Sequence, residues 1–137
     1  MNTPATSTAT RPYLLERVGE AAVVQYYADG FEALPARTKI LAYHLYEAAL
    51  SGRDIYCDQR HRHNLALRAT LEALVRHAGA IDAAVRDEIV RYTKLVWIHT
   101  GPYHSITSRK FTLNLSREAF AGAVRAAADA GARFPLR

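Results

Sequence analysis

Apolar residues at helical spacing, punctuated by glycine and proline, constrain this chain more than any other feature of its sequence. A first helix is predicted between Pro35, which suits an initial helical turn, and Gly52, which suits the position just past an end. One face of this helix is apolar, and we expect that face to be buried. Its residues are Ile40, Leu41, His44, Leu45, Ala48 and Ala49.

Three further helices follow. The second is predicted from Asn64, as an N-cap, to Gly79, which closes it in the left-handed conformation. The third begins at Asp82 and ends near His99, because the Gly-Pro pair after it breaks a helix. The last opens at Ser116 and ends near Gly131, which leaves residues 101–115 as one long irregular loop.

The N-terminal part of the chain lacks this helical pattern. Residues 1–12 are mostly Thr, Ser, Ala and Pro, and we predict a disordered lead-in. Residues 21–27 are β-branched and aromatic, which favours a short extended segment before the turn at Asp29-Gly30. The predicted fold is therefore mainly α, with about four helices, a short extended or β N-terminal segment and one long loop. Residues 13–137 form a single helical domain.

Composition narrows the class of protein. No apolar run approaches the roughly 18–20 residues that span a bilayer, and the N-terminus lacks the basic and apolar regions of a signal peptide. A lone cysteine, Cys57, excludes an internal disulfide and a Cys-rich zinc module. These features predict a cytoplasmic protein without a membrane partner.

The net charge of +5 invites a nucleic-acid interpretation, since clustered cations bind a phosphate backbone. However, the 18 Lys and Arg residues are spread along the chain among 13 Asp and Glu residues, and their densest group is Arg60-His61-Arg62-His63. We therefore predict no nucleic-acid partner.

Histidine and cysteine chemistry has little support in the spacing. His61 and His63 are two residues apart, and His99 and His104 straddle the Gly-Pro break, so neither pair has the helical spacing of a zinc site. We predict no metal site. Cys57 has Arg53, Arg60 and His61 nearby in sequence, which would suit a nucleophile, but a buried core filler is the favoured interpretation. His44 is likewise interpreted as a core histidine.

The segment 96–111 is the best candidate for binding. It combines Trp97, the Gly-Pro turn, a tyrosine, several hydroxyls and a Lys-Phe pair on one irregular connection. Aromatic and small polar side chains on a scaffolded loop suit contact with a peptide or ligand. The alternative is a loop that only packs across the helices, and the sequence leaves the two open.

Two segments resemble the N-terminal region of the dipeptidyl peptidase III family, zinc-dependent enzymes that release dipeptides. The first is residues 34–49 with the core Tyr43-His44-Leu45 followed by Ala48-Ala49, then Gly52–Ile55, Asp58-Gln59 and Asn64-Leu65. The second is Val96-Trp97 followed by Gly101, Tyr103, Ser105, Lys110 and Phe111. The resemblance extends from about residue 21 to residue 134.

The resemblance implies a part in peptide binding and none in catalysis. The family binds zinc through His-Glu-x-x-x-Gly-His and a downstream Glu in a separate lobe, and that motif is missing here. We expect no catalytic residue and no cofactor in this chain. The resemblance places six residues along the peptide cleft: Gly101, Tyr103, Ser105, Ile106, Lys110 and Phe111. The expected partners are a peptide substrate or the missing catalytic lobe, with self-association through the lobe-facing surface. The alternative is an autonomous helical peptide- or protein-binding module derived from that fold.

Overall fold

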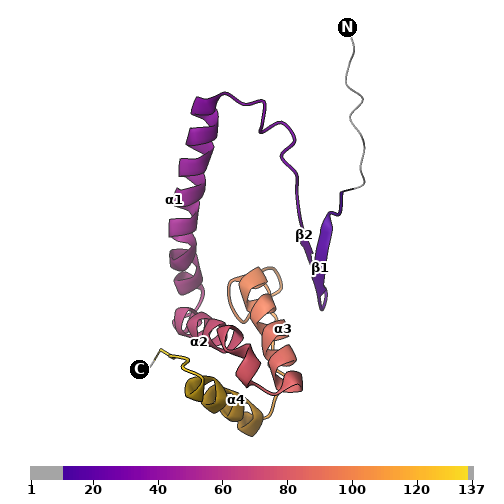
Figure 1. Cartoon of the computed structure of the whole chain (residues 1–137), viewed down its shortest axis with the longest axis vertical. Helices are drawn as coiled ribbons and strands as arrows, with labels where there is room; N and C mark the ends of the chain where they lie inside the picture. The colour runs from indigo at the N-terminus through magenta and orange to yellow at the C-terminus, as the bar shows by residue number, and fades with distance from the viewer. Residues whose placement is uncertain (1–10, 136–137) are drawn as a thin grey trace.

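The computed structural model describes residues 11–135, and it is mainly α. Four helices follow a two-stranded antiparallel sheet in chain order (Figure 1). The strands are β1 (Leu14–Val18) and β2 (Ala21–Val24), and the helices are α1 (Ala36–Arg60), α2 (Asn64–Arg76), α3 (Ala83–His99) and α4 (Arg117–Asp129), with a 3₁₀ turn η1 (Ala78–Ala80) between α2 and α3. The predicted fold class is confirmed.

The N-terminal hairpin is more regular than the sequence analysis predicted. Its first strand was missed, and the second ends at Val24 rather than Tyr27. Val18 pairs with Ala21, which leaves a two-residue turn in which Gly19 has a φ of 60°. A glycine at this turn position accepts the positive φ that joins two twisted strands. Ahead of β1, Arg11 pairs with Asp29, and the hydroxyl of Tyr27 donates to the Pro12 carbonyl; the first ten residues of the predicted lead-in lie outside the described residues.

Helices α2, α3 and α4 make the core. The larger cluster lies where α4 meets α2, η1 and α3, with Leu74, Ile89 and Ala127 at most 1% exposed. A second cluster of Leu71, Tyr92 and Val96 joins α2 to α3. Side chains from the segment after α3, including Leu113, pack against both clusters. The long loop is therefore held against the helical body at its C-terminal end.

Two of the predicted helix starts are confirmed by their caps. The Asp82 carboxylate accepts from the backbone N–H groups of Ala84 and Val85, and the Ser116 hydroxyl accepts from that of Ala119. Each side chain satisfies donors that the first helical turn leaves without a partner.

Three predicted boundaries are wrong. Helix α1 passes through Gly52 and ends at Arg60, because the residues after the glycine continue the helix and bring Cys57 to a buried position against the body. The N-cap of α2 is His63, while Asn64 is its first residue and turns its side chain inward. Gly79 lies in η1 and its φ is not positive, so it does not close α2 in the left-handed conformation.

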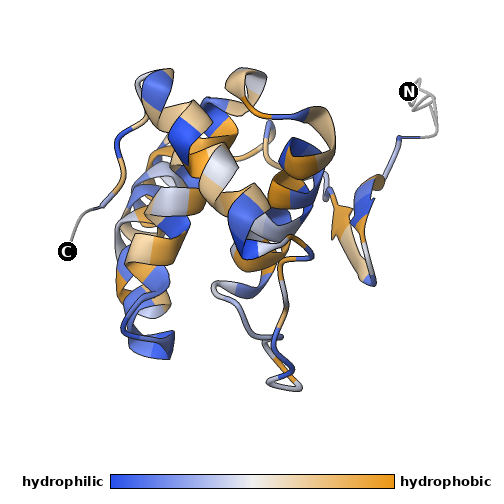
Figure 2. Ribbon diagram, turned by 90° about the horizontal axis from the view of Figure 1, so that it is seen from below, coloured by the Kyte–Doolittle hydropathy of each residue, from blue (hydrophilic) through white to orange (hydrophobic). Residues whose placement is uncertain are grey.

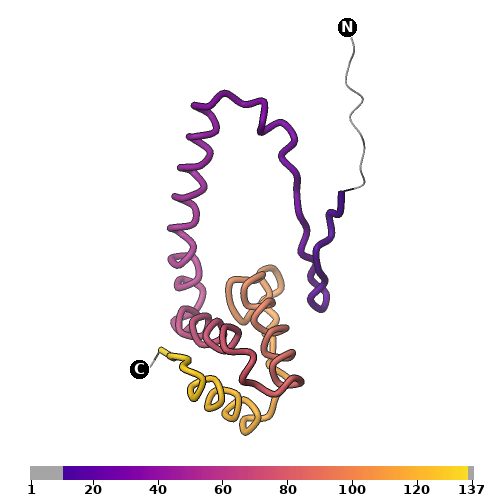
Figure 3. Tube along the Cα trace, viewed as in Figure 1, coloured from indigo at the N-terminus to yellow at the C-terminus, as the bar shows by residue number. Residues whose placement is uncertain are grey.

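Helix α1 extends away from the other helices. Its 25 residues, about 37 Å of helix, contact the body mainly through α2 at the C-terminal end. Residues 25–35 connect its far end to the hairpin (Figure 3). Of the 25 residues only Cys57 is buried, so the prediction that the apolar face of this helix is covered by the rest of the chain is wrong, and His44 is exposed rather than in the core.

Apolar side chains are exposed on the hairpin as well as on α1. Figure 2 shows apolar residues on the strands at the edge of the molecule, and Leu14, Leu15 and Val24 are each about half exposed. In the residues that the structure describes, no helix has the length and apolar character needed to cross a membrane.

Candidate functional site

The loop that follows α3 is positioned by a left-handed turn over a buried asparagine. Thr100 has a φ of 54° and Gly101 a φ of 150°, and the Gly101 N–H donates to the Val96 carbonyl at 2.9 Å. The Asn64 side-chain amide donates to the carbonyls of Cys57, at 3.0 Å, and Thr100, at 3.3 Å. One buried side chain therefore ties the ends of α1 and α3 to the start of α2.

Beyond this turn the loop folds back on itself. Tyr103 and Lys110 form an isolated antiparallel bridge, and the Phe111 N–H donates to the Pro102 carbonyl at 2.8 Å. At the tip, the His104 ring nitrogen Nδ1 accepts from the backbone N–H groups of Ile106 and Thr107. The predicted irregular loop is thus a small hairpin-like structure with its own hydrogen bonds.

The six predicted cleft residues lie on this one loop but in different environments. Gly101 is buried against Asn64, and Phe111 packs on His99 with ring centroids 4.8 Å apart. Tyr103 is half-buried, and its ring centroid is 6.4 Å from that of His61. The exposed positions are Ser105, Ile106 and Lys110, of which Ile106 at the tip is 87% exposed.

A histidine pair stiffens the base of the loop. The rings of His99 and His104 have centroids 4.6 Å apart, and the Ser105 N–H donates to His99 Nδ1. Because Nδ1 accepts a hydrogen bond, the neutral His99 ring carries its proton on Nε2. Burial lowers the pKa of His99 below the ordinary 6.5, and the neighbouring His104 and Arg60 lower it further.

The stability of the fold should therefore depend on His99 below neutral pH. Since the pKa of His99 is lower in the folded chain than in the unfolded chain, the unfolded chain binds more protons as the pH falls. The stabilising contribution is complete above about pH 6.5 and is lost as the pH falls toward the folded-state pKa. Urea unfolding between about pH 5 and 7.5 should show this loss. In the His99→Gln variant, the free energy of unfolding should change less steeply with pH over the same range. If the free energy of unfolding depends on pH equally in the two proteins, His99 is not the group responsible.

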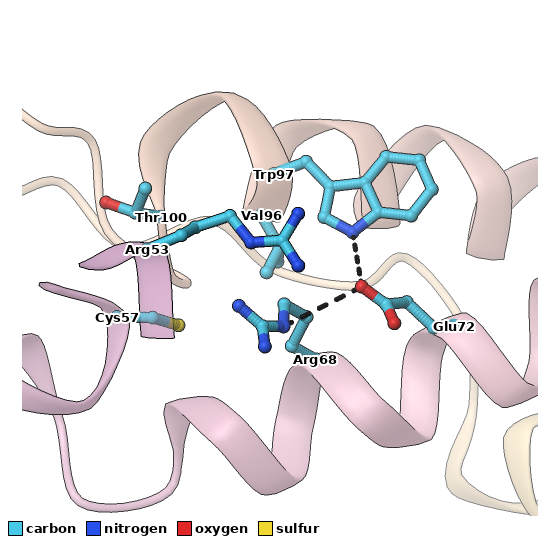
Figure 4. A pocket seen from close by; sticks show the side chains of 7 residues that line it. All are labelled: Arg53, Cys57, Arg68, Glu72, Val96, Trp97 and Thr100. Atoms are coloured by element: carbon cyan, nitrogen blue, oxygen red, sulfur yellow. Dashed lines mark hydrogen bonds and ion pairs between the residues drawn. The ribbon is translucent and has the colours of Figure 1, made fainter. Parts of the chain in front are cut away.

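Two hollows lie beside the loop. One, of about 280 Å³, lies between the loop and the hairpin turn, and its walls include His99, His104 and Phe111. An ion pair between Arg109 and Glu20, at 2.7 Å, joins the loop to the hairpin there. The other hollow, of about 290 Å³, lies between α1, α2 and α3 (Figure 4). Its lining residues are Arg53, Cys57, Arg68, Glu72, Val96, Trp97 and Thr100.

The hollow between the three helices, the three-helix pocket, was not predicted from the sequence. Cys57 and Val96 form a buried floor, while Arg53 from α1 and Arg68 from α2 reach its mouth. The Trp97 indole N–H donates to Glu72 Oε1 at 3.2 Å. The sequence offered two signals for this pocket, the i, i+4 pairs Arg53–Cys57 and Arg68–Glu72, each of which shares one face of its helix. Only the tertiary fold shows that the two helix faces lie opposite each other.

The histidines and the cysteine do not combine into a reactive group here. His61 lies against His63 and Tyr103, whereas His99 lies against His104. Cys57 is 3% exposed, as its interpretation as a core residue predicts. Among residues 11–135, no three or more His, Cys, Asp or Glu side chains are grouped so that they could hold a metal ion.

Comparison with models of known protein families gives no match, and comparison with curated proteins gives none either.

Proposed function

We propose that this chain is the N-terminal part of a dipeptidyl-peptidase-III-like zinc metallopeptidase, and that it supplies one wall of the peptide cleft and no catalytic group. The observation that carries this proposal is the exposed apolar surface of α1. Eight large apolar side chains on this helix are between 45% and 62% exposed. They are Ile40, Leu41, Tyr43, Leu45, Tyr46, Leu50, Ile55 and Tyr56.

These side chains occupy opposite faces of α1. At 3.6 residues per turn, Tyr43, Tyr46 and Leu50 share the side of Cys57, whereas Leu41 and Leu45 lie on the opposite side together with Ile55. A helix that is apolar all round belongs to the interior of a larger structure. A partner that packs against one side of α1 would cover only one of these two faces. The presence of exposed apolar side chains on both faces therefore supports enclosure of α1 by a further lobe.

The charge pattern of α1 agrees with burial. From Ile40 to Leu50 the only acidic or basic side chain other than His44 is Glu47, and the charged residues lie toward the two ends. Burying this stretch therefore requires few charged groups to lose water, which is the main cost of covering a helix. The same surface, left uncovered, favours association of the chain with itself.

The loop after α3 supports the cleft-wall part of the proposal. Its tip is exposed at Ser105 and Ile106 and its returning arm at Lys110, while its base is fixed by Asn64 and the His99–Phe111 contact. A loop with a rigid base that exposes apolar, hydroxyl and ammonium groups can line a peptide site without rearranging. Ser105, Lys110 and Phe111 are among the residues that carry the resemblance to the family, and the resemblance implies a place for Ile106 along the cleft.

In this proposal the chemistry belongs to the other lobe. A zinc ion bound there would activate the attacking water, and that lobe's glutamate would take its proton. The present chain would align the peptide and exclude water from one side of the cleft. We propose a cytoplasmic location for the assembled protein.

The proposal predicts that the chain alone is inactive. Purified protein, supplied with zinc, should show no hydrolysis of a dipeptidyl-arylamide and no stoichiometric bound metal, because it lacks the His-Glu-x-x-x-Gly-His motif. Colorimetric assay and metal analysis of the same sample provide the measurement. Turnover that a chelator abolishes, with one zinc per chain, would contradict the proposal and assign a site to the histidines at 61, 63, 99 and 104.

A second candidate function is an autonomous helical module that binds a peptide or a protein. The three-helix pocket favours it, because this pocket is formed entirely by the present chain. The two proposed functions make different predictions for the exposed surface of α1. An autonomous module remains a monomer with its own affinity for peptides, whereas a part of a larger enzyme needs a partner to cover α1.

A further inference from the structure

The three-helix pocket holds a guanidinium, of Arg53, that is only weakly engaged within the fold. Arg53 at its mouth has an exposed side chain, and its nearest carboxylate oxygen, of Asp54, is 3.7 Å from Nε. That carboxylate already accepts from Arg68 at 2.7 Å. Within residues 11–135 the Asp54 carboxylate is the only partner of the Arg53 side chain, and Arg68 holds that carboxylate more closely, so the terminal nitrogens of Arg53 can pair with a ligand.

The charges around the mouth leave a positive surplus. Glu72 is engaged by the Trp97 indole, by Arg76 at 3.2 Å and by Arg68 at 3.7 Å. Three guanidiniums therefore surround two carboxylates, and Arg53 is the one whose only ion pair, with Asp54, is as long as 3.7 Å. Figure 4 shows both pocket guanidiniums between the sulfur of Cys57 and the Trp97–Glu72 pair. The surplus favours an anionic group at this position.

The floor of the pocket is apolar. Cys57 and Val96 are each 3% exposed, and the half-exposed indole of Trp97 forms a side wall. Water that lies against this floor has few polar partners there, so an apolar side chain should displace it favourably. The volume of about 290 Å³ suits a single large side chain, since it lies just below the usual range for small-molecule pockets.

We propose that this pocket binds the C-terminal residue of a peptide. The α-carboxylate would pair with Arg53, supported by the second guanidinium of Arg68, and an apolar side chain would lie over Cys57 and Val96. In a C-terminal residue the carboxylate and the side chain leave the same Cα, which matches a single hollow lined both by guanidiniums and by the buried apolar side chains of Cys57 and Val96. An internal Asp or Glu would need a second residue to fill the floor. This site does not depend on a catalytic lobe.

Trp97 is the sole tryptophan of the chain and lines the pocket, so its fluorescence reports binding. The probes are N-acetyl-Ala-Ala-Leu as the free acid, the same tripeptide as its C-terminal amide, and N-acetyl-Ala-Leu-Glu-Ala-amide, which carries an internal acid. We expect saturable binding of the free acid, at least about tenfold weaker binding of the amide, and weaker binding of the internal acid. Calorimetry on the same samples detects binding that leaves the indole unchanged.

Arg53→Gln should weaken binding of the free acid at least about tenfold and leave the helical circular dichroism unchanged, since the side chain is exposed. The matched control is Arg125→Gln, an exposed arginine on α4, which should leave the affinity unchanged. Equal binding of acid and amide, an unaffected Arg53→Gln variant, or no binding by either method would overturn the proposal. Tighter binding of the internal acid would assign the pocket to an acidic side chain instead.

Discussion

Replacing Gly101 by alanine should destabilise the fold by about 3–5 kcal/mol, the largest effect we expect from a single methyl group. The φ of this residue is 150°, a conformation that L-residues rarely adopt, and a Cβ built there lies 2.7 Å from Asn64 Nδ2. The methyl group would displace the amide that joins the carbonyls of Cys57 and Thr100. Backbone strain at residue 101 and the loss of the buried Asn64 hydrogen bonds would therefore both destabilise the junction of α1, α2 and α3.

The matched control is Gly122→Ala on α4. A Cβ at that position meets no atom within 4 Å, and the residue lies inside a helix. Alanine should be neutral or stabilise the helix by up to about 1 kcal/mol, because it loses less backbone entropy than glycine. Urea unfolding followed by circular dichroism compares the two variants. Similar unfolding midpoints for Gly101→Ala and Gly122→Ala would contradict the account of the junction.

Substitutions on α1 should leave the isolated chain folded and weaken its docking to another lobe. Leu45→Lys and Tyr46→Lys change side chains that are 62% and 59% exposed, so each should alter the free energy of unfolding by no more than about 0.5 kcal/mol. If α1 is enclosed by another lobe, each should weaken docking by about 2 kcal/mol or more, roughly thirtyfold in affinity. The two residues lie on the two different faces of the helix, so they test coverage of both.

The reference for these variants is Leu74→Ala in the core. Leu74 is fully buried, and its truncation should cost about 2–5 kcal/mol of stability in the isolated chain. Sedimentation should also show that the α1 variants reduce concentration-dependent self-association of the chain. If Leu45→Lys unfolds the isolated chain as Leu74→Ala does, then α1 is already packed in solution and the inference from its exposure fails.

The fold was predictable where local chemistry decides it. The spacing of apolar residues gave four helices, and the side chains of Asp82 and Ser116 marked two starts because an N-cap is a contact within a few residues. The end of α1 was not predictable, since Gly52 is tolerated inside a helix whose next turns are fixed by packing at Cys57. Strand β1 was missed because a five-residue apolar and charged run has no decisive periodicity of its own.

The candidate site shows the same division. The sequence identified the loop after α3 as a unit, but not the role of Asn64, whose type suits a helix cap as well as the buried bridge it makes here. The three-helix pocket depends on residues from three helices and had no local signal. The apolar face of α1 was recognised, but its residues are exposed in the described structure, where Cys57 is the one buried residue of the helix.

The most direct test of the proposed function is complementation. A catalytic lobe bearing His-Glu-x-x-x-Gly-His, taken from a dipeptidyl peptidase III enzyme without its N-terminal region, would be mixed with this chain and assayed on a dipeptidyl-arylamide. The N-terminal region of that same enzyme serves as the positive control. We predict that this chain restores hydrolysis to at least about tenfold above the lobe alone, and that Leu45→Lys prevents it. Restoration by the enzyme's own region, but neither activity nor complex formation with this chain, would contradict the proposal.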